Sequence, residues 1–143
     1  MIRRFSFADL DRVLEIEGQA FTKSPYDLAT FLNLYRLYPE TFWVYVEKTH
    51  GWEKGRVFGY IVFARDGHII SIAVDPARRR DGIGKMLLER AINQPRIKKL
   101  RAEVRVSNRG AQSFYEEMGF RVVGVISNYY GDEDALLVEK NAR

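Results

Sequence analysis

The segment with the clearest capacity for chemistry runs from Val74 to Lys85 and joins a predicted buried strand to a predicted helix. Gly82 and Gly84 let the backbone approach an anion closely, and the first turn of the helix offers unpaired N–H groups at the positive end of its dipole. Three consecutive arginines at 78–80 add positive charge. This combination of residue types predicts a loop that binds a pyrophosphate group.

The glycine spacing of the loop differs from that of two common phosphate-binding motifs. The stretch Gly84-Lys85-Met86 lacks the earlier glycine and the following serine or threonine of the Walker loop. The three-glycine spacing of dinucleotide-binding folds is missing as well. Taken alone, the segment therefore leaves a second interpretation open, in which it is a glycine-containing turn with solvated arginines.

The loop resembles the acetyl-CoA motif of the GCN5-related N-acetyltransferases (GNAT), in which Arg79, Gly82 and Gly84 occupy the fixed positions. The preceding residues 72–76 are similar to the usual lead-in strand of that family. A second block resembles the family downstream, with Asn108, Ala111, Phe114, Tyr115, Gly119 and Phe120 in place. Within the family, residues 103–108, 128–130 and 134–135 resemble the protein N-terminal acetyltransferases of the ribosomal-protein-alanine type, whereas the loop over 131–133 is shorter and residues 22–30 match only loosely.

The resemblance implies one N-acetyltransferase domain over residues 1–143, of α/β (α+β) class, with a mixed central sheet flanked by helices on both faces. It implies acetyl-CoA as cosubstrate and no metal. Pantetheine would pair with the strand that ends at Val74, where this strand splays from the strand over 100–106. The implied cofactor-binding residues are Ile72, Ala73, Val74, Arg79, Arg80, Asp81, Gly82, Ile83, Gly84, Lys85 and Asn108.

Glu103 is the predicted general base. The resemblance implies direct attack of an amine on acetyl-CoA through a tetrahedral intermediate, whose oxyanion a backbone N–H near Val74 would stabilise. An α-amino group, with a pKa of about 7.7–8.0, needs less help from a base than a lysine near 10.4. Strand alternation places Glu103 and Arg105 on one face. The alternative is a surface glutamate paired with Arg101 or Arg105.

Tyr115 is the predicted general acid, because the family places a tyrosine at this position of the helix and a thiolate leaving group needs a proton. The alternative is a core tyrosine with a satisfied hydroxyl. Asn108 is the predicted N-cap of the same helix, and the resemblance adds a contact with the cofactor.

Four further residues are predicted to bind the acceptor. Tyr129 and Tyr130 either clamp the peptide backbone or are tyrosines at the end of a strand. Glu17 and Tyr26 are expected to line the acceptor pocket from the first two helices. The two histidines, His50 and His68, fall at predicted turns, so we expect them to be solvated and assign them no role.

Hydrophobic periodicity supplies the elements that must position these residues. Ser24 as N-cap and Pro25 at the first helical position are expected to open the second helix. Asp66-Gly67 is typical of a tight turn. The expected order is a strand over 2–5, a helix over 8–21, the helix opened at Ser24, strands over 42–46, 57–63 and 69–74, a helix over 82–93, a strand over 100–106, a helix over 108–118, and strands over 120–126 and 135–138.

Composition limits the other classes of function. The 143 residues are 46% hydrophobic and 29% charged, include no cysteine, and show neither a membrane span nor a secretion signal. We therefore expect a cytoplasmic protein, monomeric or homodimeric, without disulfides or thiolate metal sites. The net charge of +4 favours an anionic partner. Nucleic acid ranks last, because most aromatic residues fall at core positions.

Three functions remain open. The first is transfer of acetyl groups to protein N-termini. The second is acetylation of a small amine, a lysine side chain or an amino-sugar by the same fold, because a fold does not fix its acceptor. The third is a non-catalytic module that binds acetyl-CoA.

Overall fold

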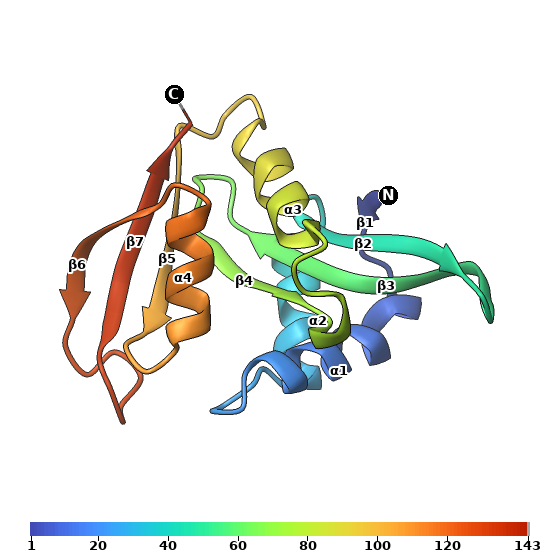
Figure 1. The fold of residues 1–143 in the computed structure, drawn as a ribbon, viewed down its shortest axis with the longest axis horizontal. Helices are drawn as coiled ribbons and strands as arrows, with labels where there is room; N and C mark the ends of the chain where they lie inside the picture. Colours follow the sequence, from blue (N-terminus) through green and yellow to red (C-terminus); the bar gives the residue numbers. More distant parts are fainter. Residues whose placement is uncertain (143) are drawn as a thin grey trace. The chain divides into compact units, whose positions relative to one another are not determined.

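The computed structural model describes residues 1–142 as an α+β protein (Figure 1). Short 3-10 turns at Phe7–Asp9 and Pro76–Arg78 precede helices α1 and α3, respectively. The elements are β1 (Ile2–Arg4), α1 (Leu10–Ala20), α2 (Leu28–Leu37), β2 (Phe42–Thr49), β3 (Trp52–Phe63), β4 (Ile69–Val74), α3 (Ile83–Ile92), β5 (Lys99–Arg105), α4 (Arg109–Glu117), β6 (Arg121–Ile126) and β7 (Ala135–Asn141). This order agrees with the one that periodicity predicts.

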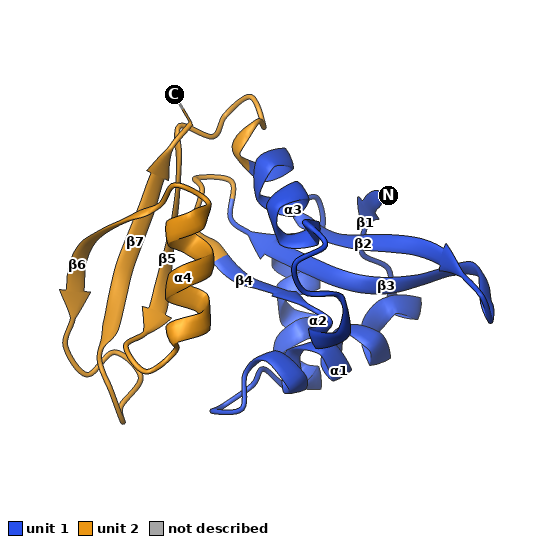
Figure 2. Cartoon of the chain, viewed as in Figure 1, with its two compact units in different colours: residues 1–64, 70–91 blue, residues 65–69, 92–143 orange. Residues whose placement is uncertain are grey.

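The chain divides into two compact units (Figure 2). Unit 1 comprises residues 1–64 and 70–91, and unit 2 comprises residues 65–69 and 92–143. The single domain expected over 1–143 stays a prediction.

Unit 1 contains a four-stranded sheet with the order β1-β2-β3-β4, in which β1 and β3 pair antiparallel with β2. Alternation along the strands gives the sheet two apolar faces. Tyr60 and Val62 belong to the core cluster that contains Val13 of α1 and Phe31 of α2. On the opposite face, Gly59 approaches α3 so closely that a Cβ there would lie 2.9 Å from Ile83 Cγ2. Helices therefore cover both faces of this sheet.

Unit 2 contains an antiparallel sheet with the order β5-β7-β6. Leu100, Ala102 and Val104 are buried, whereas the residues between them on β5 are partly exposed. The predicted alternation of this strand is thereby confirmed. A single parallel bridge between His68 and Arg101 joins the residues just before β4 to β5. In the described part of the chain, the expected parallel pairing in the sheet is limited to this bridge.

The predicted start of the second helix is wrong. Ser24 has a positive φ of 51° and lies outside the helix, which begins at Leu28. Asp27 is the N-cap, and its side chain accepts a hydrogen bond from the backbone N–H of Thr30. The strands of the first hairpin are also longer than expected, because residues 47–56 continue the pairing up to a turn at Gly51.

None of the described helices is both long and apolar enough to span a membrane.

Candidate active site

The predicted phosphate loop follows β4 in unit 1 and leads into α3. Arg79, Arg80, Asp81, Gly82 and Lys85 are exposed, whereas Ile83 and Gly84 are buried at the start of the helix. Arg80 and Gly82 both have a positive φ, of 72° and 81°. This backbone leads into α3, whose first N–H groups have no acceptor within a helix. The residues present therefore suit an anion held by backbone N–H groups and helix dipole.

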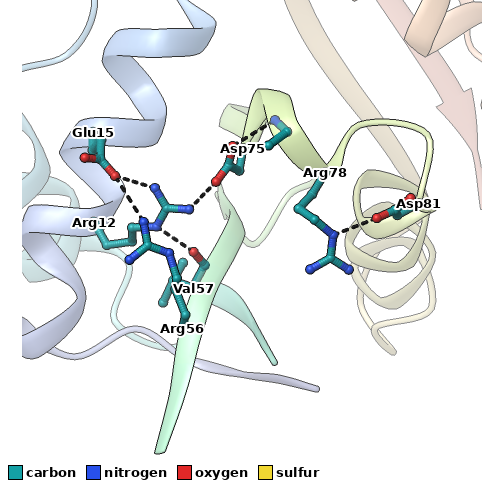
Figure 3. Close-up of polar contacts among 8 residues, drawn as sticks. Arg12, Glu15, Arg56, Val57, Asp75, Arg78 and Asp81 are labelled. Carbon is teal, nitrogen blue, oxygen red and sulfur yellow. Dashed lines mark hydrogen bonds and ion pairs between the residues drawn. The ribbon is translucent and has the colours of Figure 1, made fainter. Parts of the chain in front are cut away.

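The strand before the loop is held at its end by Arg12 of α1 (Figure 3). The guanidinium of Arg12 donates to the backbone oxygen of Val57 at 2.8 Å and pairs with the carboxylates of Asp75 and Glu15. Asp75 also accepts from the N–H of Ala77 at 2.9 Å. These contacts fix the point where the chain leaves β4. Of the three β4 residues predicted to bind pantetheine, Ala73 is buried and Ile72 and Val74 are half-buried.

Glu17 lies in a buried polar cluster of unit 1 and is 3% exposed. One carboxylate oxygen accepts from the hydroxyls of Tyr60 and Ser71, and the other accepts from the backbone N–H of Tyr26 at 2.9 Å. Burial raises the pKa of Glu17, and these hydrogen bonds oppose the rise. Both oxygens are therefore occupied, and Glu17 holds the segment between α1 and α2. Any part in acceptor binding acts through the exposed Tyr26, and it stays a prediction.

Glu103 in unit 2 is held by a histidine. Nε2–H of His68 donates to Glu103 Oε1 at 2.7 Å, and the hydroxyl of Tyr129 donates to the same oxygen at 3.4 Å. The side chain of Glu103 is 15% exposed. The two arginines considered as partners pair elsewhere: Arg101 with Asp66, and Arg105 with Asp132 and Glu133. The expectation that His68 is solvated is therefore wrong, because its side chain is 27% exposed and bonded to Glu103.

The environment keeps the Glu103 carboxylate ionised. Burial by itself raises the pKa of Glu103, but the hydrogen bonds from His68 and Tyr129 and the charge of Arg101 outweigh it. The net pKa of Glu103 lies below its ordinary value. A carboxylate that is charged at neutral pH and partly open to solvent can accept a proton directly or through a water molecule.

Tyr115 lies on α4 of the same unit, and Asn108 is the residue that precedes this helix. The Tyr115 side chain is buried, and burial together with the charge of Glu103 raises the pKa of its phenol. The phenol is therefore protonated at neutral pH, as a proton donor must be. Asn108 caps the helix as predicted, because Oδ1 accepts from the N–H of Ala111 at 3.0 Å. Its contact with the cofactor stays a prediction.

Tyr129 and Tyr130 lie on the loop between β6 and β7. Tyr129 is 47% exposed, and its ring meets Tyr130 edge to face at 4.9 Å between centroids. The guanidinium of Arg105 lies 4.2 Å from the centre of the Tyr130 ring. Tyr130 is thus fixed by the protein, whereas Tyr129 contacts Glu103 and remains largely open. The peptide clamp by Tyr129 and Tyr130 stays a prediction.

Several contacting residues were missed by sequence reasoning. His68, Tyr60, Ser71 and Arg12 hold residues that lie 35–63 positions away in the chain. One signal could have found His68: it immediately precedes the strand that leads to the phosphate loop. The others carry no local pattern that separates them from ordinary core or surface residues.

The comparisons with known proteins bear on this geometry. A model of the acetyltransferase (GNAT) family matches residues 10–120. An uncharacterized N-acetyltransferase of Methanocaldococcus jannaschii is 43% identical over 98% of this chain and 90% of its own length. A putative ribosomal protein bS18-alanine N-acetyltransferase of Bacillus subtilis is 32% identical, with 96% and 92% covered. An N-alpha-acetyltransferase of Sulfurisphaera tokodaii is 31% identical, with 96% and 90% covered.

Solved structures show the same fold. The crystal structure of Ard1 from Thermoplasma volcanium superposes with a TM-score of 0.82 at 32% identity, covering 99% of this chain and 96% of that one.

Proposed function

Because this chain belongs to the acetyltransferase (GNAT) family and is an N-acetyltransferase of that family, we propose that it acetylates the α-amino group of protein N-termini. Support for this acceptor comes from the relatives of B. subtilis and S. tokodaii, which are similar over nearly the whole chain. The observation that carries the proposal is the Glu103 carboxylate, which His68 and Tyr129 keep ionised and in place.

The base suits an α-amino group. The ammonium form of an N-terminus loses its proton near pH 7.7–8.0, so a carboxylate with an ordinary or lowered pKa can complete the deprotonation of the attacking amine. A lysine side chain near 10.4 requires a stronger base. Glu103 is contacted by a histidine and a phenol, whereas Arg101 pairs with Asp66.

The family uses acetyl-CoA, which supplies the activated acetyl group. We assign its pyrophosphate to the loop over residues 79–85, with Arg79, Arg80 and the N–H groups from Gly82 to Lys85 as the groups that hold it. The exposed left-handed backbone at Arg80 and Gly82 fits this assignment. In the reaction Glu103 accepts the proton of the attacking amine, and Tyr115 donates its phenolic proton to the sulfur as the bond from carbon to sulfur breaks.

The Tyr115→Phe variant is expected to lower kcat by about tenfold. The effect is moderate because a thiol with a pKa near 8.5 is a fair leaving group even without a proton donor. The measurement is release of the CoA thiol at saturating substrates. Tyr35→Phe is the control, because Tyr35 packs edge to face against Phe5 in the core and has no assigned role. Equal rates for the parent and Tyr115→Phe would remove Tyr115 from the proton transfer.

A panel of acceptors tests the function itself. We expect thiol release with peptides that begin with Ala, Ser or Met, and none with the same peptides after N-terminal blocking, even when they contain lysine. Turnover with the blocked lysine peptide or with a polyamine alone would replace the acceptor and keep the family. Binding of acetyl-CoA without turnover of any acceptor would favour a non-catalytic module.

The cytoplasmic location and the choice between monomer and homodimer stay predictions.

A further inference from the structure

We propose that Arg78 is a positioning residue of the phosphate loop, which fixes the backbone of residues 79–82 and does not bind phosphate itself. This inference rests on the proposed binding of acetyl-CoA at that loop. It gives Arg78 a different role from Arg79 and Arg80, although the three arginines are consecutive in the sequence.

Arg78 makes three contacts within unit 1. Its Nε donates to Asp81 Oδ2 at 2.6 Å, and its Nη2 donates to Glu47 Oε2 on β2 at 2.9 Å. Its guanidinium also lies over the ring of Phe58, 4.6 Å from the centre. Glu47 is held in turn by the hydroxyl of Tyr45. The link between Arg78 and Asp81 is drawn in Figure 3.

These contacts close the loop around a strained backbone. Arg80 lies between Arg78 and Asp81 and has a left-handed φ of 72°. Residues with a side chain rarely adopt this conformation, which costs free energy and persists where the surroundings enforce it. The pairing of Arg78 with Asp81 joins the two ends of the turn, and Glu47 anchors this pair to the sheet. The conformation of the backbone that leads into α3 is therefore set by contacts within the protein before a ligand binds.

The ion pairs also distinguish Arg78 from Arg79 and Arg80. Arg78 faces two carboxylates, which raise its pKa and neutralise its charge locally. No ion pair holds Arg79 or Arg80 within residues 1–142, and both side chains are exposed. Arg79 and Arg80 therefore supply the attraction for an anion. Arg78 fixes the conformation of the loop.

The other end of the loop is fixed independently. Asp75 accepts from the N–H of Ala77 and pairs with Arg12. Asp75 is thus held by α1 and Asp81 is held through Arg78, so both ends of the segment that contains Arg79 and Arg80 are fixed (Figure 3). Loss of the Arg78 contacts leaves the Asp75 end in place, so we expect the loop to loosen without unfolding the unit.

Equilibrium binding of acetyl-CoA, measured by calorimetry without acceptor, tests the role of Arg78. Arg78→Met is expected to raise the Kd about tenfold, because fewer molecules hold the competent loop. Arg78→Lys keeps the charge but cannot bridge two carboxylates as a planar fork does, so its Kd is expected to rise nearly as much. A Kd close to that of the parent for Arg78→Lys would show that charge alone matters and would overturn the proposal.

Asp81→Asn is expected to change the Kd for acetyl-CoA in opposite directions, depending on whether charge alone matters or Arg78 positions the loop. Removing a negative charge beside an anion site should tighten binding if only charge matters. If Arg78 acts through Asp81, the same substitution weakens binding about fivefold, and combining it with Arg78→Met adds little further. Tighter binding by Asp81→Asn would overturn the proposal.

Arg79→Met provides the matched control for charge. It should weaken binding and flatten its dependence on salt, whereas the double variant Arg78→Met with Asp81→Asn, which removes one charge of each sign, should leave the salt dependence unchanged. If the double variant flattens the salt dependence as Arg79→Met does, Arg78 contacts the phosphate and the proposal fails. Thermal unfolding of each variant identifies a folding defect. Failure of the parent protein to bind acetyl-CoA would instead contradict the proposed function.

Discussion

Glu103→Gln is expected to lower kcat by about 100-fold while changing the KM for acetyl-CoA little. The amide has nearly the shape of the carboxylate and can still meet the Nε2 or hydroxyl groups of its neighbours, but it cannot accept a proton. A loss confined to kcat therefore identifies a group that works in the transition state. The measurement is initial-rate kinetics of thiol release with a peptide whose N-terminus is free.

A matched carboxylate separates catalysis from an ordinary ion pair. Glu139 on β7 is 15% exposed, as Glu103 is, and pairs with Lys99 and Arg121. Glu139→Gln is expected to change kcat less than twofold, because exposed or half-exposed ion pairs contribute about 1 kcal/mol or less to stability and nothing to the reaction. Similar losses in both variants would show that the sheet of unit 2, and not the base, had been damaged.

The pH dependence of the rate follows from the direction of the pKa shift. Because the pKa of Glu103 is lowered, its basic form is present from below the ordinary glutamate range upward. The rate of the parent enzyme should therefore rise through the pKa of the acceptor amine, at about 7.7–8.0, and not through that of Glu103. His68→Ala removes the hydrogen bond that lowers this pKa, so it should raise the pKa of the Glu103 carboxyl, measured by NMR titration of the free enzyme. An unchanged titration would mean that His68 does not tune the base.

Local patterns predict the parts of the molecule that local physics decides. The alternation that places Glu103 opposite Ala102 and Val104 depends only on the two-residue repeat of a strand. The cap at Asn108 depends on the side chain of one residue and the N–H of Ala111, three positions away. Both could be derived before any tertiary contact was known.

Contacts between distant segments could not be derived in this way. Ser24 has good capping chemistry, but the chain around it is held by the hydrogen bond from Tyr26 to Glu17, and the helix begins later, at Leu28, with Asp27 as its N-cap. His68 meets Glu103 only because a bridge sets it beside β5. Arg78 differs from Arg79 and Arg80 because it pairs with Glu47, which lies on β2. In each case the partner is remote in sequence, and no periodicity reports it.

Gly67→Ala is expected to destabilise the protein by about 3 kcal/mol, the largest effect on stability that we predict. Gly67 has a φ of 100°, and a Cβ built there would lie 1.9 Å from the backbone oxygen of Lys99. The obstacle is backbone, so no side chain can turn aside to relieve it. The turn must move, and with it the hydrogen bond from the N–H of Arg101 to the oxygen of Gly67. Thermal unfolding should shift downward by about 10 °C.

Gly131→Ala separates the two causes of this loss. Gly131 lies in the same unit with a φ of 87°, but nothing lies within 4 Å of a Cβ at that position. Its substitution carries only the conformational cost, about 1 kcal/mol. The difference between the two variants measures the close approach of Gly67 to Lys99. Equal destabilisation would show that this approach does not exist in solution.

Gly67→Ala also tests whether the turn positions His68 for its hydrogen bond with Glu103. His68 follows Gly67 directly, and its ring reaches Glu103 from that position. A shift of the turn by even 1 Å lengthens the 2.7 Å hydrogen bond beyond its useful range. At temperatures where Gly67→Ala is still folded, we therefore expect its kcat to fall and the pKa of its Glu103 to rise, as in His68→Ala. Gly131→Ala should keep the parent's kcat and the parent's pKa of Glu103. A folded Gly67→Ala enzyme with both parent values would show that the turn serves stability alone.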